Sequence, residues 1–331
     1  MIKSKEYLFS NILDYAGTFP PEQLELKEVF QRYSKAKRSK YGWIMSRIVV
    51  PAHWMDIATT LSLYTQELPK PIELTLLLPK TDTFDNFRTR ISALERQLLI
   101  THKDHGGELK TDLLEAVLPP DVVKNPSSDL LEKCMHFLVE RMAVNRVFPN
   151  HIFIEFPKST YDLELLKPFL KRIARQNLLI RKKGLKHFEE FGYKIRIVPE
   201  EGFRLPTSRE LASLLIFCRE LHLEVKFAYS GCKAITTKDE NGVIDHFGFL
   251  NLYAAGLLSY GYDCTLAEME EILTETNPGA FIFSDKMLKY KHMMIPVGEL
   301  KMLRSVAFHS FNSSTLIQTL EEIMKTEVTE Q

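Results

Sequence analysis

Two kinds of segment alternate along the chain of 331 residues. Short runs of apolar residues are typical of buried strands. The longer segments between them carry apolar residues three and four positions apart, which is the spacing of one helix face. This pattern predicts eight strands, each followed by a helix, in the runs 42–52, 71–80, 109–120, 150–158, 192–200, 223–231, 279–285 and 306–311.

Strands that alternate with helices are joined by helical crossovers and therefore run parallel. Because the eight runs are almost continuously apolar, both faces of each strand are expected to be covered. The predicted fold class is therefore α/β, a (β/α)8 TIM-type barrel. An open doubly wound α/β sheet is the alternative, although no GxGxxG follows the first run. Residues 1–40 are predicted to form an N-terminal helical extension, with two short helices around DYAGTFPP (14–21), and residues 41–331 a single barrel.

Charged residues inside the predicted strands are the main functional signal. Side chains alternate along the run LEVKFAYSG, so Glu224 and Lys226 share one face while Val225, Phe227 and Tyr229 share the other. The apolar face is expected to meet the outer helices, which turns Lys226 toward the lumen. A buried charge is unfavourable unless it is paired, so several of them indicate one shared location, the upper lumen where barrel active sites lie. The other strand charges are Arg47, Glu73, Glu115, Glu155, Lys194 and Arg196.

Two interpretations of these charges stay open. Some barrels pair lumen charges purely as packing, and Glu73 and Glu224 stand early enough in their runs to lie at exposed strand starts. The set of Glu115, Glu155, Lys194, Arg196 and Lys226 instead indicates a substrate pocket. Because three members of this set are basic and two are acidic, the sequence favours a ligand with a carboxylate or phosphate, held by Arg196 and one lysine.

Weaker candidates lie in the loops. Asn312, Ser313 and Ser314 end the last strand and begin the last helix, where barrels often bind phosphate; a simple N-cap is the alternative. His246 follows the sixth strand and is a candidate ligand contact at the barrel mouth, although an isolated loop histidine more often has no such role. The histidines of HKDH (102–105) are interpreted as solvent-facing. No metal site and no cofactor is predicted.

Composition narrows the range of partners. Lys+Arg and Asp+Glu are balanced at 43 each, so the chain lacks the excess of positive charge that is typical of proteins that bind nucleic acid or an anionic membrane. No stretch approaches the roughly 20 apolar residues of a membrane helix, and the first residues do not resemble a signal peptide. The four cysteines lack metal-site spacing, which predicts free thiols in the cytoplasm. Oligomeric state is not determined by the sequence.

Several motifs together resemble an uncharacterised family of bacterial proteins of about this length, for which a barrel-like fold is expected. The motifs are DYAGTFPP (14–21), GWIMSRIVVPA (42–52), KIRI (194–197), EVKFAYSG (224–231), HFGFLN (246–251) and SFNSS (310–314). The resemblance places in shared motifs the residues Asp14, Tyr15, Lys194, Arg196, Lys226, Gly231, His246 and Asn251.

This chain departs from the family pattern at two places. Cys232 and Lys233 stand where the family carries paired histidines, and Asn312 stands where a glycine is expected. If those histidines bind metal or take part in chemistry, this chain has lost or altered the activity.

The stretch VKFAYSG (225–231) is similar to the lysine-bearing strand of class I aldolase barrels, in which the lysine forms a Schiff base with a carbonyl substrate. A lysine becomes nucleophilic when burial and a neighbouring cation favour its neutral form, and Lys194 or Arg196 on the adjacent strand would supply that cation. Glu155 would then shuttle the proton, and Arg196 would hold the anionic end of the substrate.

Three functional hypotheses follow. The first is a cofactor-independent lyase or aldolase for a small phosphorylated or carboxylated carbonyl compound, with Lys226, Glu155 and Lys194 as catalytic residues. The second is a degenerate barrel that binds a small anion or a protein partner without chemistry, and the third is a metal-dependent hydrolase or isomerase barrel. The expected ligand is a small anionic metabolite, and the residues predicted to contact it are Arg196, Glu115, Arg47, His246, Asn312, Ser313 and Ser314.

Overall fold

The computed structural model of the protein describes residues 1–56, 71–105, 108–124, 129–157, 161–184, 189–197, 204–229 and 233–326. Within these ranges, eight parallel strands close a barrel in the order β1-β13-β7-β6-β5-β4-β3-β2, which confirms the predicted (β/α)8 fold class. The barrel strands are β1 (Leu13–Tyr15), β2 (Met45–Pro51), β3 (Ile72–Leu77), β4 (Leu109–Val117), β5 (His151–Glu155), β6 (Phe191–Ile197), β7 (Val225–Tyr229) and β13 (Phe308–Ser313).

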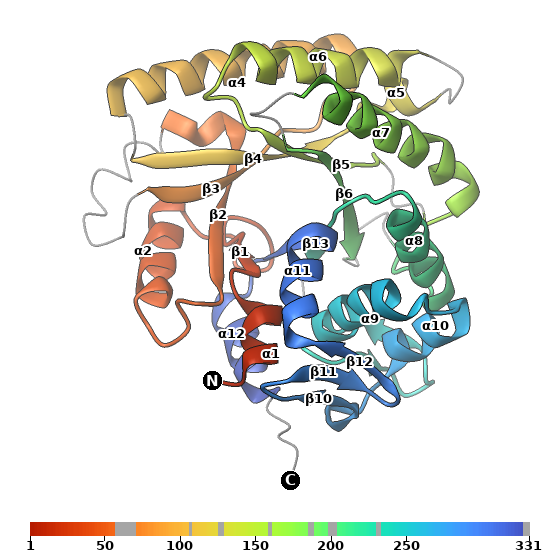
Figure 1. Ribbon diagram of the computed structural model, residues 1–331. Helices are drawn as coiled ribbons and strands as arrows, with labels where there is room; N and C mark the ends of the chain where they lie inside the picture. The colour runs from red at the N-terminus through yellow and green to blue at the C-terminus, as the bar shows by residue number, and fades with distance from the viewer. Residues whose placement is uncertain are drawn as a thin grey trace.

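Helices surround the barrel, and α4, α6 and α7 lie along the outside of β3 to β6 (Figure 1). Two helices begin with a capping box, in which Thr207 pairs with Glu210 and Thr265 with Glu268. The helix predicted to follow the strand run 42–52 falls largely outside the described residues. The described helices are α1 (Lys3–Phe9), α2 (Leu26–Lys37), α4 (Phe84–His105), α5 (Pro120–Lys124), α6 (Leu130–Val144), α7 (Leu163–Lys183), α8 (Ser208–Glu220), α9 (Phe249–Tyr262), α10 (Leu266–Thr274), α11 (Val297–Ala307) and α12 (Leu316–Lys325).

The first barrel strand lies inside the segment predicted to be a helical extension. The two short helices are present as α1 and α2, but β1 between them pairs with β13 on one side and β2 on the other. The prediction that the barrel starts after residue 40 is therefore wrong. With only three residues and Asp14 at its centre, β1 lacks the apolar run by which the other strands were recognised.

The predicted strand over 279–285 is not part of the barrel. Its residues form β10 (Phe281–Phe283), which pairs antiparallel with β11 (Met287–Tyr290), and β11 pairs antiparallel with β12 (Met293–Pro296). The connections between these strands are too short for the helical crossover that a parallel pair needs. This small sheet lies beside α1 and α11 (Figure 1).

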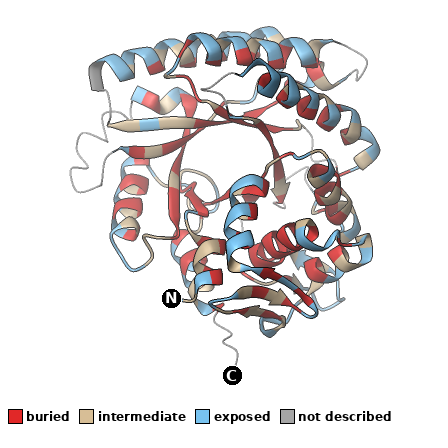
Figure 2. Ribbon diagram, in the orientation of Figure 1, coloured by how far each residue is buried: buried red, intermediate tan, exposed pale blue. Residues whose placement is uncertain are grey.

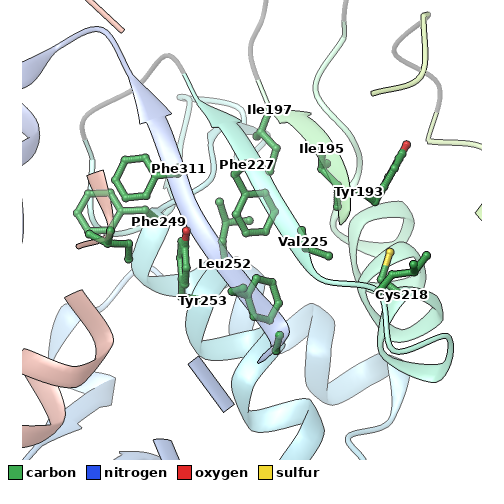
Figure 3. Packing of buried hydrophobic residues seen from close by; sticks show 14 of the residues in the cluster. Tyr193, Ile195, Ile197, Cys218, Val225, Phe227, Phe249, Leu252, Tyr253 and Phe311 are labelled. Carbon is green, nitrogen blue, oxygen red and sulfur yellow. The ribbon is translucent and has the colours of Figure 1, made fainter. Parts of the chain in front are cut away.

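The core lies between the barrel wall and the inner faces of the helices, where buried positions concentrate while the outer helix faces stay exposed (Figure 2). The predicted outward face of β7 is confirmed for Val225 and Phe227, because both are buried against the surrounding helices (Figure 3). The Phe227 ring contacts Tyr253 of α9 with 5.7 Å between ring centroids. The structure does not describe the side chain of Tyr229.

The predictions of free thiols and of a chain without a membrane helix can be compared with the structure. Cys134, Cys218 and Cys264 are free and buried, while Cys232 lies outside the described residues. Among the helices that the structure describes, none combines the length and the apolar character that crossing a membrane requires. The cytoplasmic location stays a prediction.

Candidate functional site

Lys226 lies in the barrel lumen, as predicted, and its side chain has no exposed surface. Its Nζ donates to Asp14 Oδ2 at 2.5 Å and to the Ser310 hydroxyl at 2.8 Å. Glu115 Oε1 lies 3.6 Å from the same nitrogen. The ammonium is therefore held between two carboxylates and a hydroxyl, which offsets the loss of its water shell.

A second lysine continues this network toward the barrel mouth. Lys194 Nζ lies 2.6 Å from Glu115 Oε2 and 3.1 Å from Glu155 Oε2. Arg196 binds Glu155 through two nitrogens, with Nε at 2.6 Å and Nη2 at 3.2 Å. The lumen thus contains an unbroken chain of alternating charges, from Asp14 through Lys226, Glu115, Lys194 and Glu155 to Arg196; we call these six residues the lumen network.

Strand register brings these side chains together. Lys194 is the Cα partner of both Glu155 on β5 and Lys226 on β7, so three inward-facing charges stand side by side across adjacent strands. Asp14 on β1 is paired with Asn312 on β13, and the Asn312 amide donates to both oxygens of Glu115 at 2.9 and 2.8 Å. The predicted convergence is therefore observed for Glu115, Glu155, Lys194, Arg196 and Lys226. It is not observed for Glu73, which pairs with the half-exposed Lys110, or for Arg47, which pairs with Asp112.

Asp14 was not among the predicted site residues. It is completely buried, and besides Lys226 it accepts hydrogen bonds from the Thr75 hydroxyl at 2.8 Å and the Arg47 backbone N–H at 3.2 Å. With Asp14 included, the lumen network holds three acidic and three basic groups. The excess of positive charge inferred from the sequence is thus wrong, because it omitted β1.

Three groups of the lumen network have pKa values that are shifted toward the charged form. Burial raises the pKa of Glu155, but Lys194 and Arg196 outweigh this effect and hold its pKa at about 2. Burial lowers the pKa of Lys194, yet Glu115 and Glu155 bring its pKa above the ordinary value. For Asp14, burial is likewise outweighed by Lys226, so its pKa is lowered. Each shift follows from an oppositely charged neighbour.

A cavity of about 470 Å³ lies at the C-terminal ends of the barrel strands, directly above the lumen network. Its polar lining includes Lys194, Arg196 and Asn312, whereas Lys226 is not among the described residues that line it. Its walls are mainly apolar. The described lining residues are Ala16, Phe19, Pro20, Val49, Pro51, His53, Leu77, Leu78, Pro79, Lys80, Val117, Lys194, Arg196, Ala228, Asn312 and Ser314.

Of the two serines predicted to contact the ligand, Ser314 is among the described residues that line the cavity and Ser313 is not. Ser314 lines the cavity and donates to the Pro20 carbonyl at 2.6 Å, but the Ser313 hydroxyl lies 3.1 Å from that of Thr319 on α12. Leu316 N–H, at the start of α12, donates to Glu22 Oε1 at 3.4 Å. The first turn of this helix therefore already holds a carboxylate where a phosphate was predicted.

Arg47 and His246 do not belong to the described cavity lining. Arg47 Nη2 lies 3.5 Å from Asp112 Oδ2, toward the N-terminal end of β4. His246 ends β9 (Ile244–His246), which forms a two-stranded hairpin with β8 (Thr237–Lys238) after β7. Burial and Lys233 lower the pKa of His246 to about 4. Gly231 and Cys232, named in the family resemblance, lie outside the described residues.

A second cluster, centred on the buried His151, lies lower in the barrel. His151 on β5 contacts Glu189 through Nδ1 at 2.9 Å, and its Nε2 lies 3.0 Å from Glu224 Oε2. The ring stacks on Phe153 and meets the His309 ring edge-on. The charge of Glu224 beside the sixth strand and the histidine at the start of β5 were the available sequence signals for this cluster, whereas Glu189 lies outside any strand.

We expect the His151 cluster to make stability depend on pH. Burial alone would lower the pKa of His151, but Glu189 and Glu224 raise it to about 9. The charged form is therefore favoured in the folded state, so the stabilisation is complete below pH 6.5 and is lost as pH rises through about 9. The free energy of unfolding should fall by on the order of 3 kcal/mol over this interval.

Urea unfolding at pH 6, 7.5 and 9 checks this expectation. The alkaline decrease should disappear in His151→Gln and persist in His136→Gln, whose imidazole is exposed on α6 next to Glu140. An identical decrease in all three proteins would contradict the assignment to His151.

No three His, Cys, Asp or Glu side chains in the described part of the chain gather as a set of metal ligands. Comparisons with protein-family models, with curated proteins and with solved structures found no match. The resemblances to the bacterial family and to class I aldolases therefore stay predictions.

Proposed function

We propose that the protein is a small-molecule barrel enzyme of the lyase type, and that its substrate, a carboxylated or phosphorylated carbonyl compound, occupies the cavity at the barrel mouth. The main observation that supports this proposal is the cavity itself. It has about 470 Å³, the size of a small-metabolite site, and it opens at the strand ends where barrel enzymes act. Its apolar walls and its few convergent polar groups are typical of a site that orients a small ligand.

Lys194, rather than Lys226, is the lysine we assign to the carbonyl group. Lys194 lines the cavity, whereas Lys226 is enclosed beneath it by Asp14 and Ser310. The neighbouring cation expected to activate Lys226 is not in contact with it, because the Lys194 amine is turned toward Glu115 and Glu155. The Schiff-base hypothesis is thus retained with a different nucleophile.

Imine formation at Lys194 needs the neutral amine. The ammonium is 3.1 Å from Glu155 Oε2, so this carboxylate is placed to accept its proton when the ligand enters. The neutral amine then adds to the carbonyl carbon, and Glu155 returns the proton to the carbonyl oxygen, which becomes a hydroxyl on the carbon bound to the protonated nitrogen. One proton of this nitrogen moves to the hydroxyl, the C–O bond breaks and water leaves, so that Lys194 carries a protonated iminium. Arg196, bound to Glu155 at the cavity surface, is placed to attract the anionic group of the ligand.

Binding without chemistry is the second candidate function. It is favoured by the pairing of every charge in the lumen network, since the raised pKa of Lys194 and the pKa of about 2 of Glu155 keep both groups charged near neutrality. A site that is always charged binds polar ligands but exchanges protons poorly.

Borohydride trapping distinguishes the two functions. The protein is incubated with small aldehydes, keto acids and sugar phosphates, reduced, and analysed by intact mass and peptide mapping. We expect a reduced adduct on the peptide that carries Lys194, lost in Lys194→Met and kept in Lys80→Met, which removes another cavity lysine. An adduct on the Lys226 peptide would contradict the assignment, and ligand binding without any adduct would support the second function.

A further inference from the structure

One buried acceptor in the cavity wall has no partner in the protein. Asn312 lines the cavity, is 8% exposed, and its Oδ1 accepts no hydrogen bond from any residue in the described part of the chain. A buried carbonyl oxygen without a donor is unfavourable, and native structures rarely keep one without a role.

The orientation of the amide follows from its other contact. Asn312 Nδ2 lies 2.9 and 2.8 Å from the two oxygens of Glu115. A carboxylate only accepts hydrogen bonds. If the amide of Asn312 were rotated by 180°, its acceptor Oδ1 would face the two acceptor oxygens of Glu115 and repel them. The nitrogen is therefore committed to Glu115, and the oxygen is the atom that Asn312 retains for a ligand.

We propose that Asn312 is a specificity-determining residue whose Oδ1 accepts a hydrogen bond from a hydroxyl group of the ligand, so that the substrate class is a hydroxylated carbonyl compound with an anionic group. This inference rests on the proposed function, since it names a further group on the same ligand.

A neutral hydroxyl fits this position better than an ammonium group. Lys194 already places its Nζ 2.6 Å from the same Glu115 carboxylate that holds the Asn312 amide. A second cation beside Asn312 would be repelled by Lys194, whereas a hydroxyl donates to Oδ1 and can accept from the lysine in the same site. The ligand hydroxyl would thus lie beside the carbonyl carbon that Lys194 attacks.

Matched pairs of probes that differ by one hydroxyl test the inference: hydroxypyruvate against pyruvate, and dihydroxyacetone phosphate against acetol phosphate. Binding of each to the wild-type protein is measured by titration calorimetry. We expect the hydroxylated member of a pair to bind about tenfold more tightly, the effect of one hydrogen bond. In Asn312→Ala this ratio should fall to about one.

Ser310→Ala is the matched control. Ser310 belongs to the surroundings of Lys226 but not to the described cavity lining, so this variant perturbs the lumen without touching the proposed contact and should keep the preference. Equal binding of both members to the wild-type protein would overturn the role of Asn312 and leave the proposed function standing. A preference that survives in Asn312→Ala would do the same, and failure of every probe to bind would overturn both.

Discussion

Replacing Lys226 by methionine is expected to lower the free energy of unfolding by about 3–5 kcal/mol, the usual effect of removing one partner from a buried ion pair. Asp14 lies 2.5 Å from the lysine and would stay buried as a carboxylate, with Thr75 as its remaining side-chain donor. The lost attraction is large because both side chains are fully buried, so bulk solvent does not screen the carboxylate that is left.

Urea unfolding at neutral pH measures this loss. Lys110→Met is the matched control, because Lys110 also joins two carboxylates from a barrel strand, Glu73 and Asp112, but is 47% exposed. We expect the control to lose at most about 1 kcal/mol. Adding Asp14→Asn to Lys226→Met should recover part of the stability, since it removes the unpaired carboxylate. A loss from Lys226→Met no larger than that of the control would mean that the ion pair contributes little.

Glu115→Gln is expected to be almost as destabilising, by about 3 kcal/mol, although it preserves the size of the side chain. The side chains that contact Glu115 in the described part of the chain are all donors: Lys194 at 2.6 Å, Lys226 at 3.6 Å and the Asn312 amide at both oxygens. Either orientation of a glutamine amide would place its NH₂ group against one of these donors. The substitution would also leave the lumen network with one uncompensated positive charge.

Glu73→Gln provides the comparison, since Glu73 lies on the neighbouring strand β3 with its side chain 38% exposed and paired to Lys110. The same substitution there should change the free energy of unfolding by less than about 1 kcal/mol. Thermal unfolding and urea titration of both variants measure the difference. Equal effects would show that burial and donor geometry around Glu115 do not control its contribution.

The lumen network connects stability with the proposed site. Lys194 and Arg196 belong to the network and also line the cavity, so a ligand that attracts either one competes with Glu155 for it. We therefore interpret the lower members, Asp14, Lys226 and Glu115, as the support that holds the upper ones in place. This division explains why the most buried lysine is assigned to stability and the cavity lysine to chemistry.

The barrel fold and the inward direction of several lumen charges were predictable, because both depend on the pattern of neighbouring residues in the sequence. Alternation of side chains along β6 places Lys194 and Arg196 on one face, and the same alternation on β7 separates Lys226 from Val225 and Phe227. The regular succession of apolar runs and helical segments predicts the barrel itself. Both patterns follow from the geometry of one strand or one helix and need no knowledge of distant residues.

The remaining features depend on contacts between residues far apart in the chain. A three-residue strand such as β1 exists only because β13 and β2 hydrogen-bond to it, and no local sequence pattern predicts that pairing. Its Asp14 sets the charge balance of the lumen and encloses Lys226.

The sequence alone determined the alternating α/β architecture and the inward direction of the strand charges, because both are consequences of backbone periodicity. Tertiary structure decided which charges pair, that the segment 279–285 leaves the barrel for an antiparallel sheet, and that Lys194 rather than Lys226 meets the cavity. Those outcomes depend on strand register and on depth along the barrel axis, which are set by the packing of the whole chain.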